Sequence, residues 1–166
     1  MTVNVPAGGT RGGRLPRFLA RFGNRYMLRQ FRGGNARTRG GVPVLMLETI
    51  GARSGEPRQV VLGYLVEPDA WLVIAALPGT ARNPAWLHNL GVHPDATIEP
   101  GDGSRVAVRA ETLAGDDLAS AWERIAVEAP EFVKYRSTTD RDIAVVRLRR
   151  RDGSSGAGTG TIPAGG

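Results

Sequence analysis

The feature that most constrains this chain is a series of six short apolar segments separated by turn sequences. The segments are rich in Val, Leu, Ile and aromatic residues, which favour β-strands. Turns as short as Glu67-Pro68-Asp69 and Pro100-Gly101-Asp102-Gly103 join neighbouring segments into hairpins. Mostly hairpin connections predict an antiparallel β-barrel. The expected strands are Val42–Ile50, Arg58–Glu67, Ala70–Leu77, Asp95–Glu99, Ser104–Thr112 and Ile143–Leu148.

Two helices are expected to interrupt the strands, so the expected fold class is α+β, mainly β with helices. Asn83 is a candidate helix cap, and Pro84 suits the first helical position. The short helix that follows would bury Trp86. A longer helix is predicted to begin at Asp116. Its apolar face comprises Leu118, Trp122, Ile125 and Ala129.

The chain has the length of one domain with unstructured ends. Its 166 residues can bury a core without a disulfide or a metal, and zero cysteines exclude iron–sulfur clusters and cysteine nucleophiles. Residues 1–13 and the Gly/Ser/Thr-rich residues 152–166 are too poor in apolar side chains to pack, so we expect both to be disordered. The expected domain is residues 14–151. Without an apolar span or a leader, we expect a cytoplasmic protein.

Positive charge is concentrated near the N-terminus. Nine arginines precede the first acidic residue, Glu48, although the net charge is only +6. Residues 14–32 have helical period, with arginines on one face and apolar side chains on the adjoining face. Either the apolar stripe docks on the body, or the helix lies on anionic lipid at the inner face of the membrane. Nucleic acid is not the expected partner. The apolar residues are Leu15, Phe18, Leu19, Phe22 and Tyr26.

Two segments could bind an anion. The loop from Gly51 to Arg58 offers two guanidinium groups, a hydroxyl and backbone amides beside glycines, the donor set that phosphate needs. A solvated hairpin turn is the alternative. The segment 78–89 ends in a helix N-terminus with Arg82 beside it, where Trp86 could equally be a core residue. His88 and His93 lack partners at metal-ligand spacing, so no metal is expected.

The order of these features resembles the deazaflavin-dependent nitroreductase family of actinobacteria. The residues that carry the resemblance are Thr49-Ile50-Gly51-Ala52-Arg53-Ser54-Gly55-Glu56-Pro57-Arg58, Asn83-Pro84-Ala85-Trp86-Leu87-His88-Asn89-Leu90, and Tyr135 with Thr139-Asp140-Arg141. The resemblance implies a split antiparallel β-barrel that binds reduced coenzyme F420. It also implies an oxidoreductase that passes a hydride to an activated acceptor.

The resemblance implies roles for particular residues. The cofactor's phosphate and acidic tail would bind Arg53, Ser54, Gly55 and Arg58, and its ring and side arm would contact Ala85, Trp86 and Asn89. Four further residues would line the groove. They are Val60, Val61, Ile74 and Ala76.

The acceptor would lie against Phe132 and Tyr135, with the Tyr135 phenol the candidate catalytic group. Related members have a Ser-Lys pair where this chain has Ala76-Leu77-Pro78. Because of this difference, the identity of the acceptor stays open among a quinone, a nitro compound, an enone and an imine. Three alternatives remain. They are an FMN-dependent reductase, a protein that binds the deazaflavin or another anionic ligand without turnover, and a cofactor-independent scaffold for cyclisation.

Overall fold

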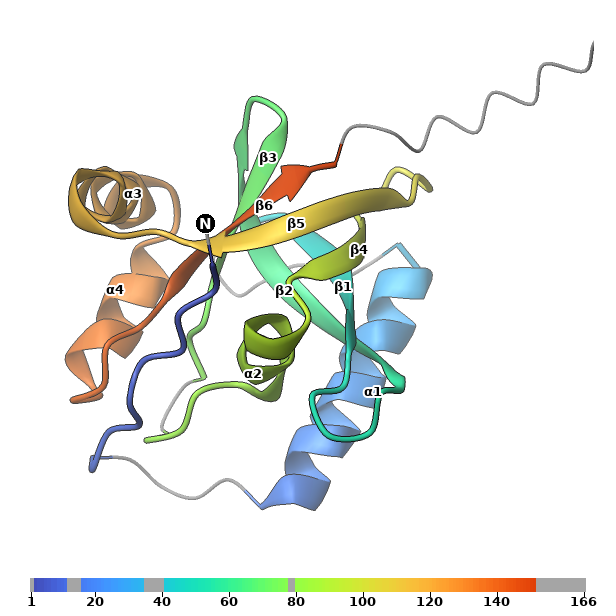
Figure 1. Ribbon diagram of the computed structural model, residues 1–166, viewed down its shortest axis with the longest axis horizontal. Coiled ribbons are helices and arrows are strands. Elements are labelled where there is room, and N and C mark those ends of the chain that lie inside the picture. Colours follow the sequence, from blue (N-terminus) through green and yellow to red (C-terminus); the bar gives the residue numbers. More distant parts are fainter. Residues whose placement is uncertain (1, 12–15, 35–40, 78–79, 152–166) are drawn as a thin grey trace, which may run out of the picture.

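The computed structural model describes residues 2–11, 16–34, 41–77 and 80–151. These ranges form four helices and six strands, whose arrangement is shown in Figure 1. The helices are α1 (Arg17–Arg32), α2 (Ala85–Val92), α3 (Gly115–Glu128) and α4 (Pro130–Ser137). The strands are β1 (Val44–Ile50), β2 (Pro57–Glu67), β3 (Ala70–Ile74), β4 (Asp95–Glu99), β5 (Val106–Thr112) and β6 (Val145–Arg150).

The six strands close into one barrel in the order β1-β2-β3-β6-β5-β4, and every neighbouring pair is antiparallel. Both predicted hairpins form, β2 with β3 and β4 with β5. The prediction of a six-stranded antiparallel barrel in an α+β fold is confirmed. Closure leaves no free sheet edge among the six strands, which removes a site for unwanted strand pairing.

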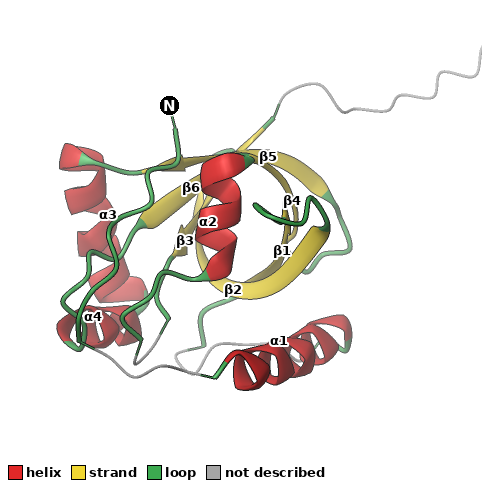
Figure 2. Cartoon of the chain, turned by 60° about the horizontal axis from the view of Figure 1, so that its bottom comes forward, coloured by secondary structure: helices red, strands yellow, loops and turns green. Residues whose placement is uncertain are grey.

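Helix α2 lies across one end of the barrel and closes it (Figure 2). Trp86, Leu87 and Leu90 extend from α2 into the core inside the barrel. There they meet inward-facing strand residues such as Leu47 and Val146, both fully buried. An eight-residue helix is too short to be stable alone, so α2 depends on this burial.

A second core lies outside the barrel, beneath α3 and α4. Ile74 and Val145 pack there against Trp122 and Phe132. Helix α4 is missing from the sequence prediction, which treated residues 132–141 as a connection. Pro130, at the start of α4, was the available signal, because proline fits the first turn of a helix.

The N-terminal arm, residues 2–11, is ordered against the barrel, which corrects the expectation of disorder. Val3 and Val5 pack on the inner core at the α2 end. The Asp140 carboxylate accepts hydrogen bonds from the backbone amides of Thr10 and Arg11 at 2.9 Å each, and from the Thr10 hydroxyl. The arm is held by hydrogen bonds to a residue that is distant in the sequence. A prediction from composition cannot find such contacts. The tail, residues 152–166, lies outside the described residues.

Helix α1 docks on β1 and β2 through a face different from the predicted one. The Asn24 side-chain amide donates to the Gln59 carbonyl oxygen at 2.7 Å, and Met27, Leu28 and Phe31 are half-buried. The predicted stripe instead points away from the barrel. Its described members Leu19, Phe22 and Tyr26 are 48%, 66% and 62% exposed. The predicted first residues, Arg14 and Leu15, lie outside the described residues. None of the described helices is long and apolar enough to span a membrane.

Shortening a buried side chain of α2, the helix that closes one end of the barrel, should destabilise the whole barrel. Leu87→Ala removes a fully buried side chain, so we expect the free energy of unfolding to fall by about 2–5 kcal/mol. The control is Val127→Ala on α3, a side chain that is 82% exposed. Urea unfolding followed by tryptophan fluorescence measures both. Equal stability of the two variants would contradict the dependence of the barrel on the burial of α2.

The arm should detach when Asp140 is neutralised. Hydrogen bonds from Thr10 and Arg11 lower the pKa of Asp140 from 3.8 to about 2. The carboxylate therefore stabilises the docked arm fully above pH 4, and this contribution is lost as the pH falls toward 2. At neutral pH, Asp140→Asn should accelerate tryptic cleavage after Arg11, whereas Asp142→Asn should not. Unchanged cleavage in Asp140→Asn would show that other contacts hold the arm.

Candidate functional site

The turn between β1 and β2 is rigid and closed on itself. The Gly51 amide donates to the Glu56 carbonyl oxygen at 2.8 Å, and the Gly55 amide donates to the Gly51 carbonyl oxygen at 2.9 Å. Gly55 has a φ of 70°, which favours glycine. The Ser54 hydroxyl oxygen accepts bonds from the Glu56 amide and the Arg58 guanidinium at 3.2 and 3.3 Å. The turn thus holds its shape without a ligand.

Asn89 ties this turn to α2. Its side-chain oxygen accepts a bond from the Ala52 amide, and its side-chain nitrogen donates to the Thr49 hydroxyl, both at 3.0 Å. Asn89 and Thr49 are 8% and 1% exposed. Both ends of the amide are therefore engaged by protein groups. The structure places Asn89 where it orients the turn relative to the helix.

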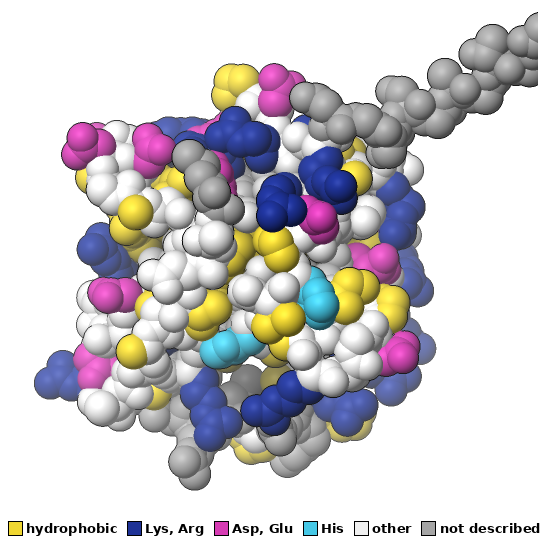
Figure 3. Space-filling model, in the orientation of Figure 1, with side chains coloured by type: hydrophobic (Ala, Val, Ile, Leu, Met, Phe, Trp, Pro, Cys, Tyr) yellow, Lys and Arg dark blue, Asp and Glu magenta, His cyan; other side chains and the backbone are white. Residues whose placement is uncertain are grey.

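Arg53 in the turn and Arg58 at the start of β2 are both exposed. Arg53 and Arg58 form no ion pair within the described part of the chain. Arg82, three residues before α2, is also exposed and unpaired within the same ranges. In Figure 3 basic side chains flank a hollow at the lower edge of this face, below the two histidines. Unpaired guanidinium groups next to a helix N-terminus attract anions.

The residues expected to contact the cofactor ring divide between the two cores. Trp86 is 6% exposed and belongs to the core inside the barrel, against which Val60 also packs. Ile74 and Ala76 belong to the outer core instead. Val61, next to Val60 on β2, points to the opposite sheet face because side chains alternate along a strand. Ala85 is exposed at the start of α2. These residues therefore do not all line one groove.

Phe132 and Tyr135 lie together on α4, with ring centroids 6.0 Å apart in an edge-to-face arrangement. Phe132 is buried and Tyr135 half-buried. Figures 1 and 2 both place α4 on one side of α2 and the β1–β2 turn on the other. The structure therefore separates the predicted acceptor residues from the predicted anion site by the width of α2 and the N-terminal arm.

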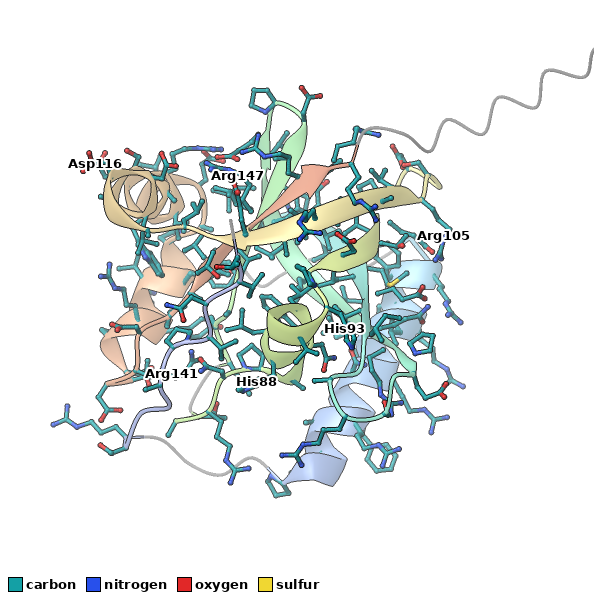
Figure 4. The ribbon with its side chains drawn as sticks, viewed as in Figure 1. His88, His93, Arg105, Asp116, Arg141 and Arg147 are labelled. Atoms are coloured by element: carbon teal, nitrogen blue, oxygen red, sulfur yellow. The ribbon has the colours of Figure 1, made fainter. Side chains whose placement is uncertain are left out.

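Arg141 is a buried residue to which the sequence analysis gave no role of its own. Its guanidinium is buried, with the residue 5% exposed, and it donates to the Ala75 carbonyl oxygen at 3.0 Å and the Asn83 side-chain oxygen at 3.1 Å. Burial lowers the pKa of Arg141. Figure 4 shows Arg141 beside the chain that leads into α2. Only the fold brings residues 75 and 141 together, so no sequence signal identifies this contact.

The predicted capping role of Asn83 is wrong. Pro84 occupies the N-cap position of α2, and no side chain caps that helix. Asn83 instead accepts the Arg141 bond and donates to the Pro6 carbonyl oxygen at 2.6 Å. Because Asn83 is buried, its side chain is used for tertiary contacts rather than for the helix amides.

Two surface depressions lie away from these residues. One, of about 240 Å³, is lined by residues that include Tyr64 and Val66, and another, of about 520 Å³, lies around Trp122 and Arg136. Neither includes a residue expected to bind the cofactor. Within the described ranges, no group of three or more His, Asp or Glu side chains is placed to hold a metal ion.

Comparison with known proteins identifies the family. The model of the family described as F420H(2)-dependent quinone reductase matches residues 21–150. A Mycobacterium tuberculosis protein named F420H(2)-dependent quinone reductase is 37% identical over 128 residues, which cover 73% of this chain and 85% of that protein.

Solved structures agree with this relationship. The chain described as F420-H2 dependent reductase FDR-A has a TM-score of 0.59 at 27% identity and covers 64% of this chain and 94% of its own. Another, described as a domain-swapped dimer, has a TM-score of 0.60 at 25% identity, with coverage of 81% and 100%. With its antiparallel barrel and the family match over most of its length, this chain belongs to the F420H(2)-dependent quinone reductase family.

Proposed function

We propose that this protein transfers a hydride from reduced coenzyme F420 to a quinone, and that the β1–β2 turn binds the anionic end of the cofactor. The observation that carries this proposal is the pair of exposed arginines, Arg53 and Arg58, on a rigid turn fixed to α2 by Asn89. Family membership supports the cofactor and the reaction.

The donor groups of the turn fit a phosphate. A guanidinium donates two parallel hydrogen bonds to phosphate oxygens, and the turn is already ordered, so little conformational entropy is lost on binding. Arg53 and Arg58 would bind the phosphate and acidic tail, with Gly55 allowing close approach of the backbone. Ser54 would act indirectly, because its hydroxyl already orients Arg58 at 3.3 Å. FMN also carries a phosphate, so preference between the two cofactors separates the alternatives.

The rest of the bound ligand would extend past the N-terminal end of α2. Ala85 is exposed there and leaves room for a flat ring, while buried Trp86 anchors the helix beneath it. This assignment makes Trp86 and Asn89 supports of the site. An elongated cofactor suits the arrangement, because the β1–β2 turn and α4, which carries Phe132 and Tyr135, lie on opposite sides of α2 (Figure 2).

When bound, reduced F420 supplies the hydride from its deazaflavin ring. Reduction of a quinone to a hydroquinone takes this hydride and one proton. The Tyr135 hydroxyl would donate a hydrogen bond, and then the proton, to a quinone oxygen; solvent would reprotonate it because Tyr135 is half-exposed. Phe132 holds the Tyr135 ring by edge-to-face packing and helps to exclude water.

The exposed face of α1 would bind the membrane, where lipophilic quinones reside. Leu19, Phe22 and Tyr26 are spaced along one helix face that points away from the barrel. The arginines beside this stripe, including Arg25 and Arg29, are exposed. Aromatic and apolar side chains flanked by arginines are typical of a helix lying at an anionic lipid surface. The exposure of the stripe favours this interpretation over docking on the body.

The cofactor site is tested by removing its two cations. The double variant Arg53→Ala, Arg58→Ala loses charge-assisted hydrogen bonds worth about 1.5–3 kcal/mol each, so affinity for F420 should fall at least tenfold. Oxidised F420 is titrated into the protein and its fluorescence followed, with FMN in parallel. The control variant Arg105→Ala, Arg109→Ala removes the same charge from two exposed arginines that form ion pairs. Equal affinity of the two double variants would contradict the site.

Membrane binding is tested on the stripe of α1. Phe22→Ser with Tyr26→Ser should weaken binding to vesicles of anionic phosphatidylglycerol by about tenfold or more, since burying one such ring is worth about 1.5–3 kcal/mol. Val127→Ser, at a still more exposed apolar position on α3, is the control. Flotation with anionic and with zwitterionic vesicles measures binding. Full retention by the α1 variant would exclude this face.

A further inference from the structure

The buried guanidinium of Arg141 has no carboxylate partner within the described ranges. Arginine is rarely buried unless it is paired, because the loss of hydration costs free energy. The neighbouring Asp140 carboxylate is engaged by the N-terminal arm instead. Arg141 must therefore offset its burial through neutral oxygen atoms.

All of these oxygen atoms belong to one segment, residues 75–83. The guanidinium donates to the Ala75 carbonyl at 3.0 Å, to the Thr80 carbonyl at 3.5 Å and to the Asn83 side chain at 3.1 Å. Ala75 directly follows β3, and Asn83 lies two residues before α2. Arg141 thus connects the first and last parts of the segment that joins this strand to this helix.

The same segment is held on its other side by the N-terminal arm. The Gly9 amide donates to the Ala81 carbonyl at 2.8 Å, and Asn83 donates to Pro6. The Thr80 hydroxyl donates to the Arg82 carbonyl at 3.2 Å. The backbone on both sides of Arg82 is therefore fixed, while the Arg82 side chain is exposed and unpaired among the described residues.

We propose that Arg141 is a positioning residue for the cofactor site, and that it fixes Arg82 as a third cation for the anionic end of F420. The inference rests on the proposed function, because it assigns a residue to the same site. Arg82 lies three residues before α2, whereas Arg53 lies in the β1–β2 turn and Arg58 at the start of β2. Asn89 links the turn to α2, so the three cations belong to one rigid frame.

The geometry requires arginine at position 141. A guanidinium is planar and presents several N–H donors in fixed directions, so it can bond carbonyls from separate parts of the segment at once. Lysine would keep the charge but bond fewer of the oxygens from a single nitrogen. Methionine would fill part of the volume without any donor. Affinity for F420 should therefore be highest in the unmodified protein, lower in Arg141→Lys and lowest in Arg141→Met.

The experiment is a fluorescence titration of oxidised F420 into the full-length protein and its variants. Arg141→Met and Arg82→Ala should each raise the Kd about tenfold, as expected for one lost charge-assisted contact. Arg82→Ala should do so without lowering Tm, because its side chain is exposed. In turnover, KM for reduced F420 should rise in both variants while kcat at saturation changes less than about twofold, the pattern expected when binding alone is lost.

The matched control is Arg147→Met. Arg147 is also largely buried, but it pairs with Glu67 and Glu111 at the opposite end of the molecule (Figure 4). It should lower Tm and leave the Kd unchanged. If Arg141→Met behaves like Arg147→Met, or if Arg82→Ala binds F420 like the unmodified protein, the proposal is wrong.

The outcomes also separate this inference from the proposed function. Failure of the unmodified protein to bind F420 would overturn both. Tight binding that is lost in the Arg53→Ala, Arg58→Ala variant but kept in the Arg82 and Arg141 variants would overturn only the present inference. If Arg141→Met does not fold, Arg82→Ala and Asn83→Ala decide the question, because each leaves the buried guanidinium in place.

Discussion

The structure depends on the burial of α2 across one end of the barrel. Leu87 and Leu90 are fully buried, and their burial orders a helix that is too short to persist alone. The same helix carries Asn89, whose amide fixes the β1–β2 turn through Ala52 and Thr49. Apolar burial thereby sets the position of the polar groups that form the candidate site. The barrel supplies a rigid frame, and α2 transmits that rigidity to the turn.

Arginines in the described part of the chain have contrasting environments. Arg147 is paired with two glutamates on the outer face of the barrel, and Arg141 is buried among carbonyl and amide oxygens. Arg53 and Arg58, in contrast, stay exposed without counter-ions among the described residues. The net charge of +6 conceals this division. Functional inference depends on which charges the protein leaves unneutralised, because these are available to an anionic ligand.

Sequence reasoning was most successful where local pattern decides the structure. The alternation and turns around residues 67–69 and 100–103 predicted both hairpins, and the apolar spacing of Leu118, Trp122 and Ile125 predicted the buried face of α3. The resemblance assigned the motif residues of the turn and of α2 to one site, and in the structure Asn89 joins the turn to α2. The family motifs also identified the fold, which the comparisons confirm.

The failures concern contacts between distant parts of the chain. Thr10 reaches Asp140, and Arg141 reaches Ala75, so the ordered arm and the buried guanidinium have no local signature. The apolar stripe of α1 was expected either to dock on the body or to lie on lipid, yet α1 docks through another face, on which the polar residue Asn24 bonds to Gln59. Periodicity identifies an apolar face but does not say which surface will cover it.

We infer that Arg53 and Arg58 recognise the anionic end of the cofactor. The most direct measurement compares the affinity of F420 with that of a deazaflavin lacking the phosphate and tail, in the unmodified protein and in Arg53→Ala, Arg58→Ala. We expect the unmodified protein to prefer F420 by at least tenfold, and the variant to lose most of this preference, as coupled groups do in a double-mutant cycle. An undiminished preference in the variant would contradict it.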